Sequence, residues 1–254
     1  MSVLTIALNT FRETIRNRIL LNILLFAIGL ILLSLVVGEW SMNNQIRVIK
    51  DFGLSAMSIF GLLIAIFIGI RLMVQELEQK TIYVLASKPI HRWQIVVGKY
   101  LGLGLTLAVN VVLMSLALAF TNLVMEGTVD LGIVPAIGLL YVEILLIVAF
   151  ALFFSTIMSP TLASISTFAI FTIGHITDFL REYTELYPDK GLHWLLKTIY
   201  YTMPNLENLN LKMAAVDHLA RPPHAFEYGL LYGAAYIGIV LLLSVFTFNR
   251  KDFK

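Results

Sequence analysis

The sequence contains no cysteine and few charged residues. Without cysteine the chain has no disulfide, no thiolate nucleophile and no cysteine-ligated metal. Only 13% of the residues are charged, whereas 59% are hydrophobic and the mean hydropathy is +0.86, which excludes an ordinary soluble domain. The net charge of +2 is small and the basic residues are dispersed, so no nucleic-acid partner is expected. We therefore expect a protein of the lipid bilayer.

The sequence also lacks the motifs of common catalytic and nucleotide-binding sites. It contains no GxxxxGK[ST], HExxH or GxSxG, so neither a phosphate-binding loop nor these hydrolytic centres are predicted. His175 and Asp178 lie one turn apart and are expected to form a structural pair, since a metal site needs three or four ligands. We predict no catalytic residue, no cofactor and no metal.

Six apolar runs account for most of the chain. They cover residues 19–37, 53–70, 100–124, 131–157, 161–177 and 229–248. Each is close to the ~20 residues that a helix needs to cross the bilayer core, and a spanning segment must satisfy its backbone hydrogen bonds internally. We predict an all-α membrane protein with six transmembrane helices, forming a single transmembrane domain over residues 1–254. A cleavable signal peptide is not expected.

Basic residues are distributed unevenly between the two sides that six spans create. Eleven lysines and arginines lie on the side shared by the termini, against seven on the other side. Five of those seven lie in a long loop that also carries seven acids. The positive-inside rule therefore places both termini in the cytoplasm of a multi-pass protein in the cell (inner) membrane.

An amphipathic segment precedes the first apolar run. Leu4, Leu8, Phe11 and Ile15 recur at helical spacing, with arginines on the other face. Such a stripe predicts an N-terminal helix that lies in the membrane interface. The alternative is that this segment is simply the start of a long first helix.

The long loop of residues 178–227 has helical patterning of its own. One amphipathic stretch runs over residues 192–200, and a second follows Asn205, which stands at a helix-cap position. These patterns predict two short helices on the outer face before the last span. Long structured loops often serve assembly or function. An outer-face accessory protein is therefore one interpretation, and a lid that only caps the bundle is the other.

Glu143 is the only acid deep within a predicted span. An ionisable group at that depth is costly and invites a functional interpretation. We expect Glu143 to be protonated or hydrogen-bonded, either to Asn110 of the neighbouring span or to a hydroxyl. A structural role is favoured, and a substrate or ion pathway that includes Glu143 and Asn110 is the alternative.

The connector between the second and third runs is too polar for lipid and too apolar for a solvated loop. A short helix is predicted over residues 75–86, ended by Pro89, with a new helix beginning near Ile90. Gly98 and Gly102 form a GxxxG that permits close approach of another helix. A semi-apolar helix outside the bilayer favours a protein partner, while the alternative is an ordinary hairpin with solvated charges.

These residues resemble the permeases of the ABC type-2 export family. The connector pattern is Glu76-x-x-x-Lys80-Thr81-Ile82, then Leu85-x-x-x-Pro89-Ile90-x-Arg92, then Gly98-Lys99. Residues 203–208, Met-Pro-Asn-Leu-Glu-Asn, look like an outer-loop motif of the nitrous-oxide-reductase maturation permeases within that family.

The resemblance implies that the connector is a coupling helix bound by a separate ATP-binding-cassette ATPase. It implies contact residues at Glu76, Glu78, Lys80, Thr81, Tyr83, Leu85, Pro89 and Arg92. The chain would then be the permease subunit of an exporter, working as a homodimer by alternating access. A secondary, ion-gradient-driven transporter and an intramembrane enzyme are the alternatives, but the spans supply little of the charge or catalytic residues that either needs.

Overall fold

The computed structural model describes residues 3–41, 44–78, 91–128, 130–186, 193–217 and 224–250. Every element in these ranges is helical, which confirms the predicted all-α membrane protein. The elements are α1 (Val3–Ile15), α2 (Arg18–Trp40), α3 (Gln45–Glu78), α5 (Arg92–Glu126), η1 (Leu131–Ile133), α6 (Val134–Ile157), α7 (Pro160–His175), α8 (Thr177–Leu186), α9 (His193–Thr202), η2 (Leu206–Leu209), α10 (Lys212–Val216) and α11 (Ala225–Arg250).

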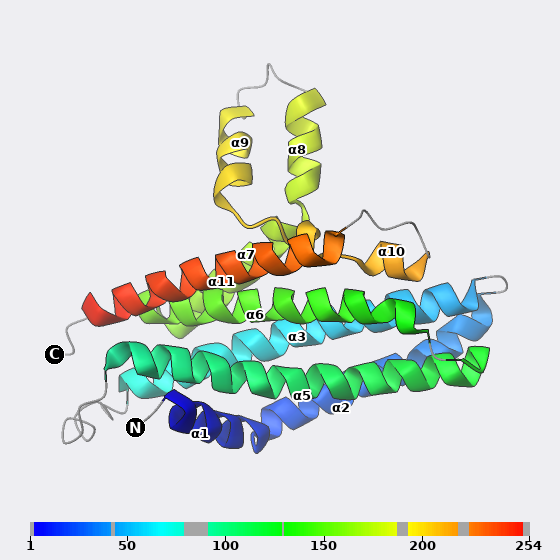
Figure 1. Ribbon diagram of the computed structural model, residues 1–254, viewed down its shortest axis with the longest axis horizontal. Coiled ribbons are helices and arrows are strands. Elements are labelled where there is room, and N and C mark those ends of the chain that lie inside the picture. The colour runs from blue at the N-terminus through cyan, green and yellow to red at the C-terminus, as the bar shows by residue number, and fades with distance from the viewer. Residues whose placement is uncertain are drawn as a thin grey trace.

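Five helices in the described ranges are long and apolar enough to cross a bilayer, namely α2, α3, α5, α6 and α11. A sixth span exists if α7 and α8 are counted as one broken helix, because they meet at a bend of 54°. The long helices run side by side (Figure 1), and α1 and the C-terminal end of α11 lie at the same end of the bundle. We call this the termini end and the opposite one the far end.

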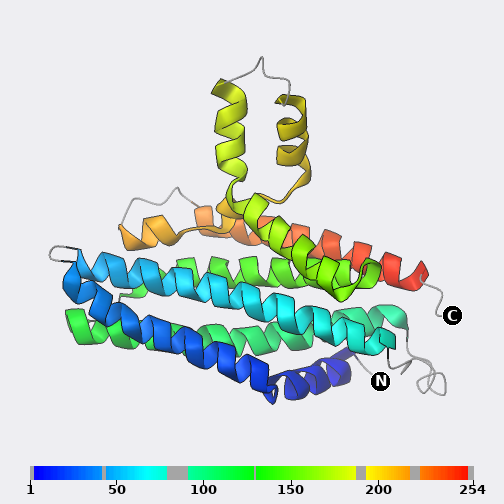
Figure 2. The same cartoon turned by 180° about the vertical axis from the view of Figure 1, so that it is seen from behind.

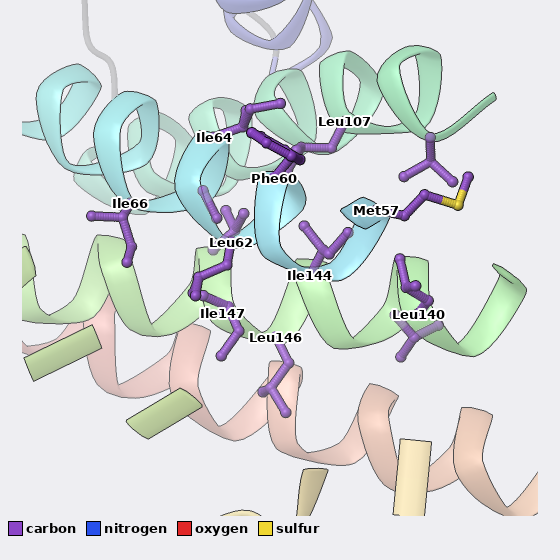
Figure 3. Close-up of a cluster of buried hydrophobic side chains, with 14 of the residues drawn as sticks. Met57, Phe60, Leu62, Ile64, Ile66, Leu107, Leu140, Ile144, Leu146 and Ile147 are labelled. Carbon is purple, nitrogen blue, oxygen red and sulfur yellow. The ribbon is translucent and has the colours of Figure 1, made fainter. Parts of the chain in front are cut away.

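The centre of the bundle is formed by α3 and α6. Figure 3 shows Met57 and Leu62 of α3 close to Leu140 and Ile147 of α6. Phe60 and Ile64 lie on the other side of α3, near Leu107 of α5. By contrast, α2 and α11 bury little of their apolar surface, and residues such as Leu25 and Leu242 are exposed. Helices that are apolar all round suit lipid contact on their outer faces.

The N-terminal segment is a helix separate from the first span. Asn17 lies between α1 and α2 in an extended conformation, and its Oδ1 accepts a hydrogen bond of 2.9 Å from the backbone N–H of Ile19. This side-chain cap starts α2 anew, which excludes a single continuous first helix. We call the resulting bend the elbow. From it α1 continues toward the termini end (Figure 2), where it packs against α5.

The segment between α7 and α11 carries more helix than the sequence predicted. The predicted stretch 192–200 corresponds to α9, but its partner α8 was missed because its many charged residues hide any apolar run. The two form a hairpin that projects from one side of the bundle (Figure 1). The predicted helix after Asn205 is instead broken into η2 and α10, because Asn210 pairs with Glu207 and caps the N–H of Lys212.

Candidate functional site

The predicted coupling residues fall largely beyond the described part of the chain. Those outside the described residues are Lys80, Thr81, Tyr83, Leu85 and Pro89. Glu76 and Glu78 lie in the last turn of α3, which runs unbroken from Gln45. The predicted helix over residues 75–86 is therefore wrong at its start, because no proline or glycine after Gly69 interrupts α3 before Glu78; its residues 79–86 lie outside the described part of the chain.

The helix that follows the connector is fixed to its neighbours within its first two turns. The guanidinium of Arg92 donates to the carbonyl oxygens of Phe248 and Asn249, at 3.3 and 3.2 Å, near the end of α11. Helix C-termini leave such carbonyls without intrahelical partners, so a cation there stabilises the end. The buried Lys99 ammonium donates to the carbonyl oxygen of Leu72 in α3, at 2.6 Å.

The GxxxG of α5 receives α1. A Cβ built on Gly98 would lie 2.7 Å from the Cβ of Ile6, and one on Gly102 would lie 2.5 Å from the carbonyl oxygen of Ala7. The absence of side chains thus permits near backbone contact, as the motif predicted. The start of α5 is consequently held by α1, α3 and α11 together.

Glu143 lies at the centre of a small polar cluster in the bundle. Its side chain is 1% exposed, and its Oε1 accepts a hydrogen bond of 3.4 Å from the hydroxyl of Ser58 in α3. His175, at the end of α7, places Nε2 3.4 Å from the same oxygen. The alternative of a hydroxyl partner is therefore confirmed, whereas Asn110 donates instead to the carbonyl oxygen of Thr106 in its own helix.

His175 is paired differently from the prediction. It contacts Glu143, while Asp178 accepts a hydrogen bond of 2.7 Å from the side chain of Asn205. The bend between α7 and α8 separates the two residues that an unbroken helix would have placed on one face.

The same geometry argues against Ser58, His175 and Glu143 acting as a hydrolytic triad. His175 Nδ1 lies 3.1 Å from the carbonyl oxygen of Phe171, which can only accept, so that nitrogen carries a hydrogen. A triad needs the histidine between the acid and the nucleophile. Here the carboxylate lies between the serine and the histidine, so the arrangement ties helices together instead.

Residues 203–208 fill the space beside the C-terminal end of α7. Leu206 and Leu209 of η2 are fully buried, and a Cβ built on Gly174 would lie 2.5 Å from Cγ of Leu206. Asn205 caps η2 through the N–H of Glu207, and its own N–H donates to the hydroxyl of Tyr232 in α11, at 2.7 Å. We call this segment the plug, since it packs among α6, α7 and α11.

Two ion pairs that the sequence did not predict close the far end. The fully buried ammonium of Lys50 lies 2.7 Å from Asp130 before η1. Arg47 forms a two-contact pair with Asp217 after α10, at 2.8 and 3.0 Å. The sequence analysis treated Lys50 and Arg47 only as charges of a predicted loop. Nothing in their spacing indicates partners so far along the chain.

Architecture and sites together define a polytopic helical membrane protein without a recognisable catalytic constellation in its described residues. The model of the ABC-2 family transporter protein matches residues 4–253, and the chain therefore belongs to the ABC-2 transporter family. It is the membrane component of an ABC transporter, a class that works with an ABC ATPase. A comparison with curated proteins finds no match.

Proposed function

We propose that this permease is an exporter driven by a separate ATPase subunit that binds the connector between α3 and α5. It works as a homodimer in the cell (inner) membrane, with the termini end in the cytoplasm. The observation that carries the proposal is the anchoring of α5 directly after the connector. Arg92, Gly98 and Lys99 join this helix to α11, α1 and α3.

These anchors give a mechanical route from the connector to the membrane helices. A displacement of the connector moves the start of α5, and the contacts of Arg92 and Lys99 oblige α11 and α3 to move with it. Packed helices respond to such a push as rigid bodies rather than by continuous deformation. Closure of two ATPases on ATP would in this way switch access to the membrane cavity from one side to the other.

The segment between α7 and α11 supports two finer proposals. The plug, with its motif of residues 203–208, supports a relationship to the nitrous-oxide-reductase maturation permeases. The α8–α9 hairpin exposes Phe179, Trp194 and Tyr201, and exposed aromatic side chains are typical of protein contacts. An accessory protein on the outer face is therefore the further partner that we propose.

For Glu143 we propose the structural role. Its contacts with Ser58 and His175 join α6 to α3 and α7. A place in the substrate pathway together with Asn110 is the competing proposal, supported by one fact: Glu143 Oε2 and Asn110 Oδ1 are buried without a hydrogen-bond partner among the described protein atoms.

The test uses two variants that separate binding from coupling. Tyr83→Ala removes a proposed aromatic anchor, which is worth about 2 kcal/mol or more at a protein interface, and we expect less ABC ATPase to co-purify with the tagged chain. Lys99→Met leaves all eight proposed ATPase contacts unchanged but removes the hydrogen bond to the Leu72 carbonyl of α3, so we expect normal co-purification with ATP hydrolysis uncoupled from transport.

Tyr228→Ala, at an exposed position in the first turn of α11, serves as the control and should leave both readouts unchanged. The purified chain alone should hydrolyse no ATP. ATPase activity of this polypeptide by itself, or full transport in the absence of any ATPase, would contradict the proposal.

A further inference from the structure

A pocket of about 380 Å³ lies at the termini end, where the elbow between α1 and α2 faces α3. The elbow contributes Asn17, Arg18 and Ile19, and α3 contributes Ile68, Arg71 and Gln75. The pocket therefore combines two guanidinium groups and two carboxamides with an apolar wall. Leu72 lines the pocket and also accepts the hydrogen bond of Lys99, whereas none of the residues of the Glu143 cluster lines it.

The two arginines of this pocket are without partners among the residues that the structure describes. Neither Arg18 nor Arg71 forms a hydrogen bond or an ion pair with any residue that the structure describes. One acid, Glu13, also lines the pocket, and it too has no such partner. Asn17 uses its Oδ1 to cap α2, which leaves its amide hydrogens to donate. Two arginines against one acid, at the positive end of α2, favour an anion.

The position of the pocket beside the lipid-facing surface indicates which class of anion would bind there. Arg18 is the first residue of the apolar helix α2, so the pocket lies where the polar elbow gives way to the lipid-facing surface. Ile19 lines it and is 45% exposed, and Leu25 one to two turns further is 68% exposed. The planar guanidinium of an arginine can donate two parallel hydrogen bonds to the oxygens of one phosphate group.

We infer that this elbow pocket binds a phosphate group, held by Arg18 and Arg71, and that its apolar wall takes the first acyl carbons of an anionic phospholipid. Anionic head groups attract basic residues at this depth. The site goes beyond the proposed transport function, because none of the residues that line it is a proposed contact of the ATPase.

Binding can be measured on the full chain purified in detergent, by native mass spectrometry with titrated phosphatidylglycerol. We expect Arg18→Gln/Arg71→Gln to raise the dissociation constant of the lipid at least about tenfold. The loss of charge-assisted hydrogen bonds to a phosphate reduces the binding free energy by about 1.4 kcal/mol or more, which corresponds to this factor. The matched control is Arg12→Gln/Arg16→Gln, which removes the same charge from two exposed positions outside the pocket, one in α1 and one in the turn after it. It should change affinity less than about twofold.

Other ligands identify the source of the phosphate, and a lysine variant separates the loss of the arginine contacts from misfolding. Phosphatidylcholine should bind more weakly, because its own cation competes with the arginines. Inorganic phosphate that binds as tightly as the lipid, with the same dependence on Arg18 and Arg71, would support the phosphate site but assign it to a soluble anion. Arg18→Lys/Arg71→Lys keeps the charge without the planar fork, so its affinity should lie between those of the unchanged chain and the glutamine variant. Equal effects of both glutamine variants, or no effect of either, would overturn the inference.

Discussion

The contact between α1 and α5 offers a sharp test, because Gly102 faces backbone rather than a flexible side chain. In Gly102→Ala the new Cβ would lie 2.5 Å from the carbonyl oxygen of Ala7 and 2.6 Å from the Cβ of Thr10. Ordinary contacts begin at 3.4 Å, so α1 would have to withdraw by roughly 1 Å, since interiors are close-packed. Overpacking of this kind costs about 1–3 kcal/mol.

Alanine stabilises a helix by up to ~1 kcal/mol relative to glycine. A control variant is therefore needed that has this gain without the clash. Gly29→Ala in α2 is such a control, because a Cβ there meets nothing within 4 Å. We expect Gly102→Ala to melt a few degrees below Gly29→Ala in detergent, at about 2–4 °C per kcal/mol for a chain of this size.

A local readout distinguishes withdrawal of α1 from a general loss of stability. Thr10 is 4% exposed against α5, and the chain has no cysteine of its own. A cysteine introduced at Thr10 should therefore react with a maleimide faster in the Gly102→Ala background than in the Gly29→Ala background. Equal melting temperatures and equal labelling rates in the two backgrounds would refute the close packing of α1 on Gly102.

Two further predictions concern the buried acid and the orientation. Glu143→Gln keeps the shape of the side chain and an oxygen that can accept a hydrogen bond from Ser58. We therefore expect unchanged assembly by size-exclusion chromatography and unchanged transport. Normal assembly with abolished transport would instead assign Glu143 to the substrate pathway. With the termini in the cytoplasm, a cysteine at Lys190 should react with an impermeant reagent in intact cells while one at Ser87 is protected; the opposite pattern would invert the orientation.

Composition and periodicity were enough to predict the membrane class and the helical fold. Long apolar runs leave a chain no other way to satisfy its backbone in lipid, so the predicted runs match α2, α6 and α11 to within four residues at each end. The helix α3 extends eight residues beyond its predicted run at both ends, and α5 begins eight residues before its run. The amphipathic stripe before Asn17 likewise predicted α1, and the GxxxG at Gly98 predicted a close helix neighbour without naming it.

Contacts between distant residues were decided only by the tertiary structure. The pairs Lys50–Asp130 and Arg47–Asp217 join residues far apart in the chain, and no local pattern encodes which charges will meet. The bend after His175 turned its side chain to Glu143 instead of Asp178. Local sequence thus determined which segments are helices, because propensity and backbone satisfaction in lipid act within a segment. Partners depend on how helices pack, and packing is a property of the whole bundle.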